Sequence, residues 1–168
     1  MSMFENNHYR WRETYLVLFA SENQPKLATV EKALRRLDPR YELANASADE
    51  AGRFESLSLI SHDDFAALDI CYVEGEEVRE QVVGLVEELQ PMACETGSEA
   101  QLQQIRRYDA RFDVLHFEEM SESLGDEDDV LDEALDPSAL LLVMAELARL
   151  TAGVAIDPQS GTLFSDGA

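Results

Sequence analysis

The chain has 168 residues, 45 % of them hydrophobic and 8 % aromatic, which is enough for one ordinary domain with its own core and excludes global disorder. Its charge is unusual, because 35 acidic residues against 13 basic ones leave a net charge of −22. Nucleic acid and anionic membranes repel such a molecule, so the sequence predicts no direct nucleic-acid partner and no membrane partner.

The first predicted elements are a buried strand and an amphipathic helix. Residues 15–20 are apolar on both alternating faces, which predicts a central strand buried on both sides of a sheet. Apolar residues at three- and four-residue spacing then predict a helix that ends at Asp38-Pro39. Its apolar stripe consists of Leu27, Val30, Leu34 and Leu37.

A group of strands and a second helix follow. A short strand is expected around Tyr41 and Leu43, and two longer ones over 54–61 and 67–73, joined by a turn at His62-Asp63-Asp64. After Gly75 a second apolar stripe predicts a helix that ends before Pro91.

The second half of the chain predicts further helices and strands. A short helix is expected over 98–108 and a strand over 111–117. Residues 137–151 are apolar almost all round, Leu142 included, which predicts a buried, central helix. A small hairpin of residues 154–156 and 162–164 then closes the chain.

The order of these elements indicates the fold class. We expect a single α+β domain over residues 1–168, with helices packed on a mixed or antiparallel sheet and a buried C-terminal helix before the hairpin. The order in the first half is that of a ferredoxin-like, split βαβ arrangement. This match is architectural and implies no function by itself.

The most acidic part of the chain is the segment 118–136. It holds ten carboxylates and no basic residue, which predicts a solvated and mobile segment within the domain. Its acidic side chains, together with the outer side of residues 76–88, are the predicted interaction surface. In the segment this surface comprises Glu118, Glu119, Glu122, Asp126, Glu127, Asp128, Asp129, Asp132 and Glu133.

Standard catalytic and nucleotide-binding motifs are absent from the sequence. The eight glycines match neither GxxxxGK[ST] nor GxGxxG, and neither GxSxG nor HExxH occurs. We therefore expect no catalytic residues and no cofactor.

Histidines beside carboxylates provide an alternative. His62 precedes Asp63 and Asp64, and His116 lies two residues before Glu118 on one face of a predicted strand. Imidazole and carboxylate groups are common metal ligands, so a fold that brought the two groups together would form a metal site. The alternative function is a metal-dependent enzyme or a metal-binding protein.

The cysteines and the apolar segments indicate a location. Cys71 and Cys94 form no CxxC motif, which is typical of reduced thiols in a cytoplasm. The apolar run 15–20 is too short for a signal-peptide core, and 139–145 is too short to cross a bilayer. We therefore expect a cytoplasmic protein, whose oligomeric state the sequence does not define.

Two interpretations of the charge stay open. In the first, the protein is a non-enzymatic module that binds a basic protein through its acidic surface, because opposite charge steers association. In the second, the acidity serves solubility alone.

Overall fold

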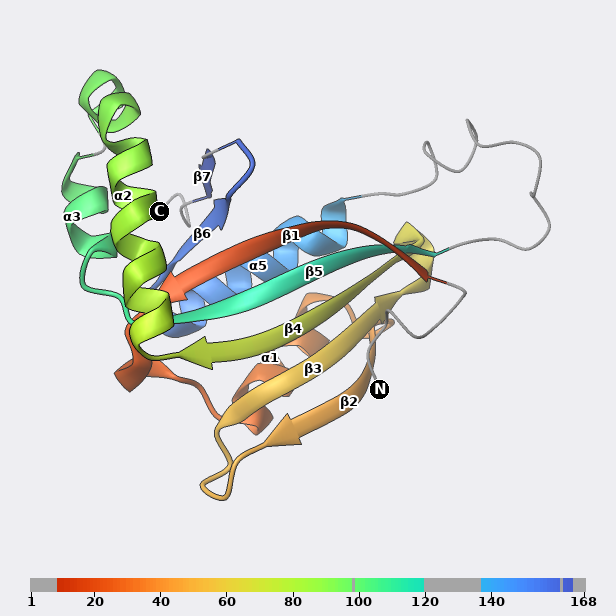
Figure 1. The fold of residues 1–168 in the computed structure, drawn as a ribbon. Helices are drawn as coiled ribbons and strands as arrows, with labels where there is room; N and C mark the ends of the chain where they lie inside the picture. Colours follow the sequence, from red (N-terminus) through yellow and green to blue (C-terminus); the bar gives the residue numbers. More distant parts are fainter. Residues whose placement is uncertain (1–8, 98, 120–136, 161, 165–168) are drawn as a thin grey trace, which may run out of the picture.

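An antiparallel sheet of seven strands runs through the residues that the computed structural model describes, which are 9–97, 99–119, 137–160 and 162–164 (Figure 1). The strand order is β2-β3-β4-β5-β1-β6-β7. The strands are β1 (Tyr9–Phe19), β2 (Glu42–Ala48), β3 (Phe54–Ser61), β4 (Ala66–Glu74), β5 (Ala110–Glu119), β6 (Val154–Asp157) and β7 (Thr162–Phe164). The helices are α1 (Leu27–Leu37), α2 (Glu76–Thr96), α3 (Glu99–Ile105) and α5 (Ser138–Thr151), with short 3-10 turns η2 (Ser21–Asn23) and η3 (His62–Asp64).

Helices pack on both faces of the sheet and divide the core into two main layers. α1 and α5 cover one face, where they contact the side chains of Val17 and Phe19 of β1. α2 and α3 cover part of the other face, where they contact Leu16 and Leu18. Because successive side chains of a strand point to opposite faces, β1 contributes to both layers. The predicted central strand over 15–20 is therefore confirmed.

The α+β class and the antiparallel sheet are confirmed, but the ferredoxin-like strand order is not. In a split βαβ unit, one strand lies between the two parallel strands that a helix connects. Here β5, β4 and β3 all lie between β1 and β2, which α1 connects. β4 and β5, which α2 and α3 connect, are direct neighbours. Hydrophobic periodicity identifies strands without specifying which of them pair, so it could not give this order.

The C-terminal elements lie where they were predicted, with one correction. α5 and the β6–β7 hairpin are present. However, Leu142 is 48 % exposed and Leu141 is similarly exposed, so α5 is not buried all round. The helix lies on one face of the sheet and buries the opposite side, which includes Val143 and Leu147.

α2 also differs from the expectation. The prediction that this helix ends before Pro91 is wrong, because α2 continues through Pro91 to Thr96. Proline lacks the amide hydrogen that would bond one turn back, yet helices tolerate it at the cost of that bond. Within the part of the chain that the structure describes, no helix is long and apolar enough to span a membrane.

Candidate interaction surface

Two residues of the predicted acidic surface, Glu118 and Glu119, lie at the end of β5. The Glu118 side chain is 1 % exposed and accepts a hydrogen bond of 2.6 Å from Nη2 of Arg10, with Nη1 of Arg12 at 3.9 Å. Arg10 is the register partner of Glu118 on β1. The expectation that Glu118 belongs to an exposed surface is therefore wrong, because the neighbouring strand supplies its counter-charge. Glu119 is partly exposed and faces His62.

The other acidic residues of this predicted surface lie outside the described residues. They are Glu122, Asp126, Glu127, Asp128, Asp129, Asp132 and Glu133.

His62 lies between two carboxylates at the η3 turn. Its Nδ1 is 3.3 Å from Oε1 of Glu119, and its Nε2 is 3.3 Å from Oε2 of Glu42. Burial lowers the pKa of His62, but the hydrogen bond to Glu42 and the charge of Glu119 outweigh burial, so the pKa is raised above its usual value. The imidazolium form is therefore favoured at this exposed position.

His116 lies in a different environment on the same strand as Glu118. The residue is 2 % exposed, and neither ring nitrogen has a hydrogen-bond partner among the described residues. Burial lowers its pKa, and the effects of Glu13 (raising) and Arg12 (lowering) are smaller. The ring is therefore held neutral.

The two histidine groups do not form a metal site in the described part of the chain. Asp63 forms an ion pair with Arg40, and Asp64 accepts a hydrogen bond from Ser61 at 2.8 Å. Within residues 9–97, 99–119, 137–160 and 162–164, no three His, Cys, Asp or Glu side chains are arranged to hold a metal ion.

The outer face of α2 is acidic. Its opposite side packs into the core through Val78, Val82, Val86 and Leu89, which leaves the glutamates exposed. These are Glu76, Glu77, Glu80, Glu87 and Glu88. Arg79, the single base between residues 76 and 88, faces Asp109 at 3.6 Å. None of the five glutamates forms an ion pair with another described residue.

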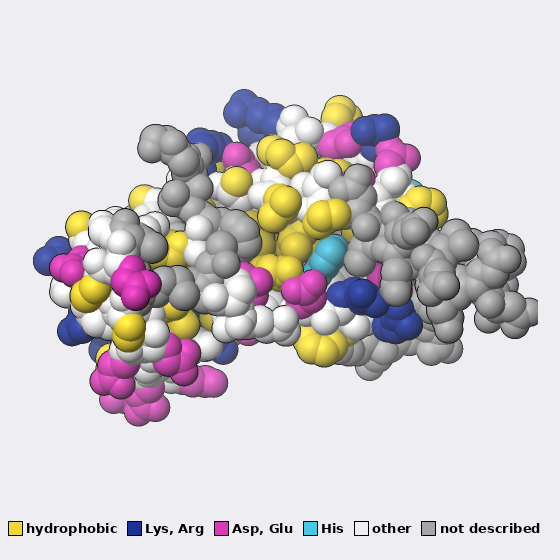
Figure 2. Space-filling view, turned by 90° about the horizontal axis from the view of Figure 1, so that it is seen from above, with side chains coloured by type: hydrophobic (Ala, Val, Ile, Leu, Met, Phe, Trp, Pro, Cys, Tyr) yellow, Lys and Arg dark blue, Asp and Glu magenta, His cyan; other side chains and the backbone are white. Residues whose placement is uncertain are grey.

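An apolar residue lies within this acidic face. Val83 is 55 % exposed, one turn from both Glu80 and Glu87. We call these five glutamates together with Val83 the α2 face. Figure 2 shows acidic side chains gathered at the end of the molecule where α2 lies.

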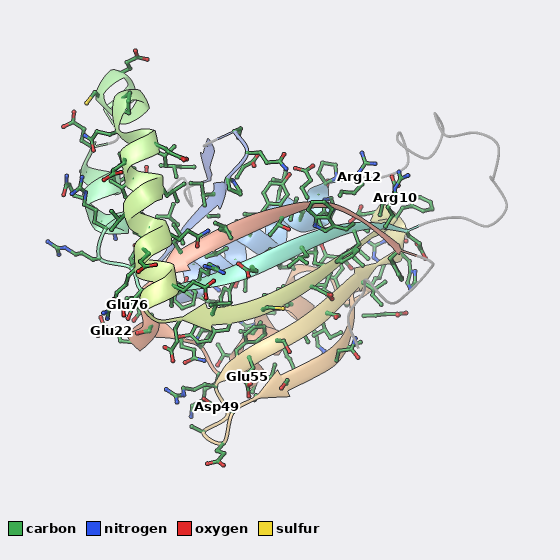
Figure 3. The ribbon with its side chains drawn as sticks, in the orientation of Figure 1. Arg10, Arg12, Glu22, Asp49, Glu55 and Glu76 are labelled. Carbon is green, nitrogen blue, oxygen red and sulfur yellow. The ribbon has the colours of Figure 1, made fainter. Side chains whose placement is uncertain are left out.

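Charged side chains of both signs lie at each end of the sheet, since Arg53 pairs with Asp49 at one end and Arg10 with Glu118 at the other. The end of the sheet where α2 begins carries Glu22, Asp49, Glu55 and Glu76 (Figure 3). Arg10 and Arg12 lie at the other end, next to buried Glu118.

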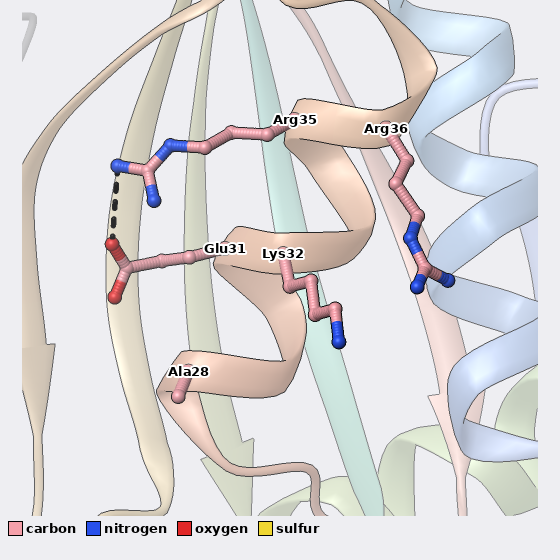
Figure 4. A pocket seen from close by; sticks show the side chains of 5 residues that line it. All are labelled: Ala28, Glu31, Lys32, Arg35 and Arg36. Carbon is pink, nitrogen blue, oxygen red and sulfur yellow. Dashed lines mark ion pairs between the residues drawn. The ribbon is translucent and has the colours of Figure 1, made fainter.

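α1 carries a basic hollow on the opposite face of the sheet. Lys32, Arg35 and Arg36 line this open hollow of about 450 Å³ together with Ala28 and Glu31 (Figure 4). Glu31 pairs with Arg35 at 3.6 Å, whereas neither Lys32 nor Arg36 has an ion pair within the described residues. The sheet thus separates a basic helix from an acidic one. This hollow was not predicted, although the spacing of the three bases along one helix could have indicated it.

Comparison with known proteins gives no family. No protein-family model, curated protein or solved structure matches this chain. The arrangement of charge on the surface is therefore the observation from which a function can be argued.

Proposed function

We propose that this protein is a non-enzymatic interaction module that binds a basic protein through the α2 face. The observation that carries the proposal is a row of exposed glutamates on one helix, without ion-pair partners among the described residues. Charges of this kind raise association rates by steering an oppositely charged partner over several ångströms.

The exposed Val83 gives the α2 face a short-range contact. Charged rims mainly govern the rate of association, whereas packed apolar side chains at the centre of an interface govern the lifetime of a complex. The proposal assigns these two roles to the glutamates and to Val83. We place the protein in the cytoplasm, which its free thiols Cys71 and Cys94 support.

A pair of charge-matched variants tests the proposal. The first, Glu80→Gln with Glu87→Gln, removes two charges from the α2 face. The second, Glu50→Gln with Glu55→Gln, removes two exposed charges near the β2–β3 turn. With a short peptide of alternating lysine and alanine as the probe, association should slow about threefold or more in the first variant and less in the second.

Both variants have the same net charge, so the comparison separates local recognition from bulk charge. Equal slowing in the two variants would overturn the proposal. The acidity would then serve solubility, which is the second interpretation of the sequence.

A further inference from the structure

A small polar hollow lies on the face of the sheet that α2 and α3 cover in part. Figure 1 shows no described helix in front of β2 and β3 on this side. The hollow has a volume of about 260 Å³ and is lined by side chains from three adjacent strands. Its polar side chains are Asn45 of β2, Ser56 and Ser58 of β3, and Asp69 and Cys71 of β4.

The polar side chains of the hollow form a directed chain of hydrogen bonds. Oγ of Ser58 donates to Oδ1 of Asp69 at 2.6 Å, and Nδ2 of Asn45 lies 3.4 Å from Oγ of Ser58. Ser58 and Asp69 are register partners, and Asp69 is 8 % exposed. Asn45 donates to Ser58 and Ser58 donates to Asp69, so this chain of hydrogen bonds ends on the Asp69 carboxylate. A carboxylate that lines a polar hollow attracts a cation.

The pKa of Cys71 is shifted by negative charges near the hollow. Burial raises the pKa of its thiol, and the charges of Asp69 and Asp113 raise it further. Burial disfavours any charged group, whereas the negative charges of Asp69 and Asp113 favour a cation. Arg111, a base on the same face of β5, is held by Asp113 at 2.8 Å and by Gln81 of α2 at 2.6 Å.

The hollow and the α2 face belong to the same side of the molecule. Val73 follows Cys71 by two residues on β4, so both side chains point to one face of the sheet. Val73 packs against the cluster that contains Val78 and Val82 of α2. A partner that lies along α2 can therefore extend over β4 to the hollow.

From these contacts we propose that the hollow receives the ammonium or guanidinium group of a lysine or arginine side chain of the basic partner. A volume of about 260 Å³ is below the roughly 300–1,000 Å³ of pockets for drug-sized ligands and suits one extended side chain. Asp69 supplies the counter-charge, and Ser58, held by Asn45, fixes its carboxylate. The claim that the cation belongs to a basic partner rests on the proposed function. The claim that the hollow binds a cation rests on the residues of the hollow alone.

The chemistry is tested with a free cation. Propylguanidinium chloride is titrated against the protein while the backbone amides of Ser56, Ser58 and Asp69 are followed by NMR. The expected result is a saturable shift with a dissociation constant of about 1–10 mM, since a single exposed ion pair gives weak affinity. Uncharged propylurea should give no such shift. Absence of saturation, or an equal response to propylurea, would overturn the inference.

Variants locate the binding. Asp69→Asn should weaken propylguanidinium binding about tenfold or more, as expected for loss of the counter-charge. Glu55→Gln removes a charge from the same strand outside the hollow and should leave binding unchanged. Should Asp69→Asn fail to fold, Ser56→Leu fills the hollow, retains Asp69 and should also abolish the shift. Undiminished binding in a folded Asp69→Asn or Ser56→Leu variant would overturn the inference.

The peptide of alternating lysine and alanine tests the source of the cation. Bound to the unmodified protein, it should shift the amides of the hollow and those of α2 together. If it shifts α2 alone, the proposed function stands and the assignment of the hollow to a partner side chain falls. If the two charge-matched variants associate equally, the proposed function falls, whatever the free cation does.

Discussion

Two buried ionisable side chains on one face of β5 are accommodated in different ways. Glu118 forms an ion pair with Arg10 of the neighbouring strand and lies close to Arg12. His116 has no hydrogen-bond partner among the described residues and stays neutral, because burial lowers its pKa. Removing one partner of a buried ion pair leaves an uncompensated charge, whereas a neutral buried imidazole becomes costly when it is protonated.

The pH dependence of stability follows from the lowered pKa of His116. The contribution of neutral His116 to the free energy of unfolding is fully present above pH 6.5, the usual pKa of histidine. It is lost as the pH falls from 6.5 towards the pKa of His116 in the folded protein, because the unfolded chain then binds an extra proton. His116→Leu should therefore flatten the fall in the free energy of unfolding between about pH 7 and pH 5. Urea unfolding across this range measures the slope. A slope like that of the unmodified protein would contradict the prediction.

His62 provides a control of opposite sign. Its raised pKa gives a contribution that is present below 6.5 and is lost as the pH rises through the folded value. His62→Gln should therefore reduce the free energy of unfolding at about pH 5.5 and leave it unchanged at about pH 9. The same urea titrations check this difference.

At the scale of elements, each helix of the two main core layers buries one side against the sheet. α5 illustrates why composition alone did not reveal this: its mid-helix leucines are apolar whether they face the core or solvent. Because a single layer of helices covers this face of the sheet, Leu141 and Leu142 point away from it and are exposed. A helix that is apolar nearly all round is therefore not always central.

Adjacent substitutions in α5 test this orientation. Leu142→Asp should change the free energy of unfolding by less than about 1 kcal/mol, because the residue is half exposed. Val143→Asp should destabilise the protein by more than about 3 kcal/mol, because it places a charge in the core without a partner. Thermal and urea unfolding give both values. Equal destabilisation by the two variants would contradict the position of α5.

The α2 face carries a prediction of its own. Val83→Ser should leave the free energy of unfolding within about 0.5 kcal/mol, since the side chain is mostly exposed. It should speed dissociation of a basic partner more than it slows association, because apolar packing acts at short range. Biosensor traces separate the two rates. A change confined to association would contradict the role proposed for Val83.

For the whole molecule, local sequence patterns predicted individual strands and helices, but they did not predict which strands pair. Alternation and helical spacing located β3 and β4 and the limits of α1, since these depend on neighbours in sequence. The burial of Glu118 depends on Arg10, which lies 108 positions away, and no local pattern records that the two strands pair. Likewise, strand pairing brings Asn45, Ser58 and Asp69 together, so local sequence patterns do not predict the hollow.

Charge separation across the sheet leads to the last prediction. Lys32→Gln combined with Glu80→Gln leaves the net charge at −22, as does Lys32→Gln combined with Glu50→Gln. Charges act over roughly 8 Å at physiological ionic strength, so Lys32 on α1 and a peptide on α2 are screened from each other across the sheet. Association of the lysine-alanine peptide should therefore slow about twofold with Glu80→Gln and remain unchanged with Glu50→Gln. Stopped-flow mixing at about 0.15 M salt measures both association rates. Equal rates would mean that the net charge, and not the α2 face, determines how fast the peptide associates.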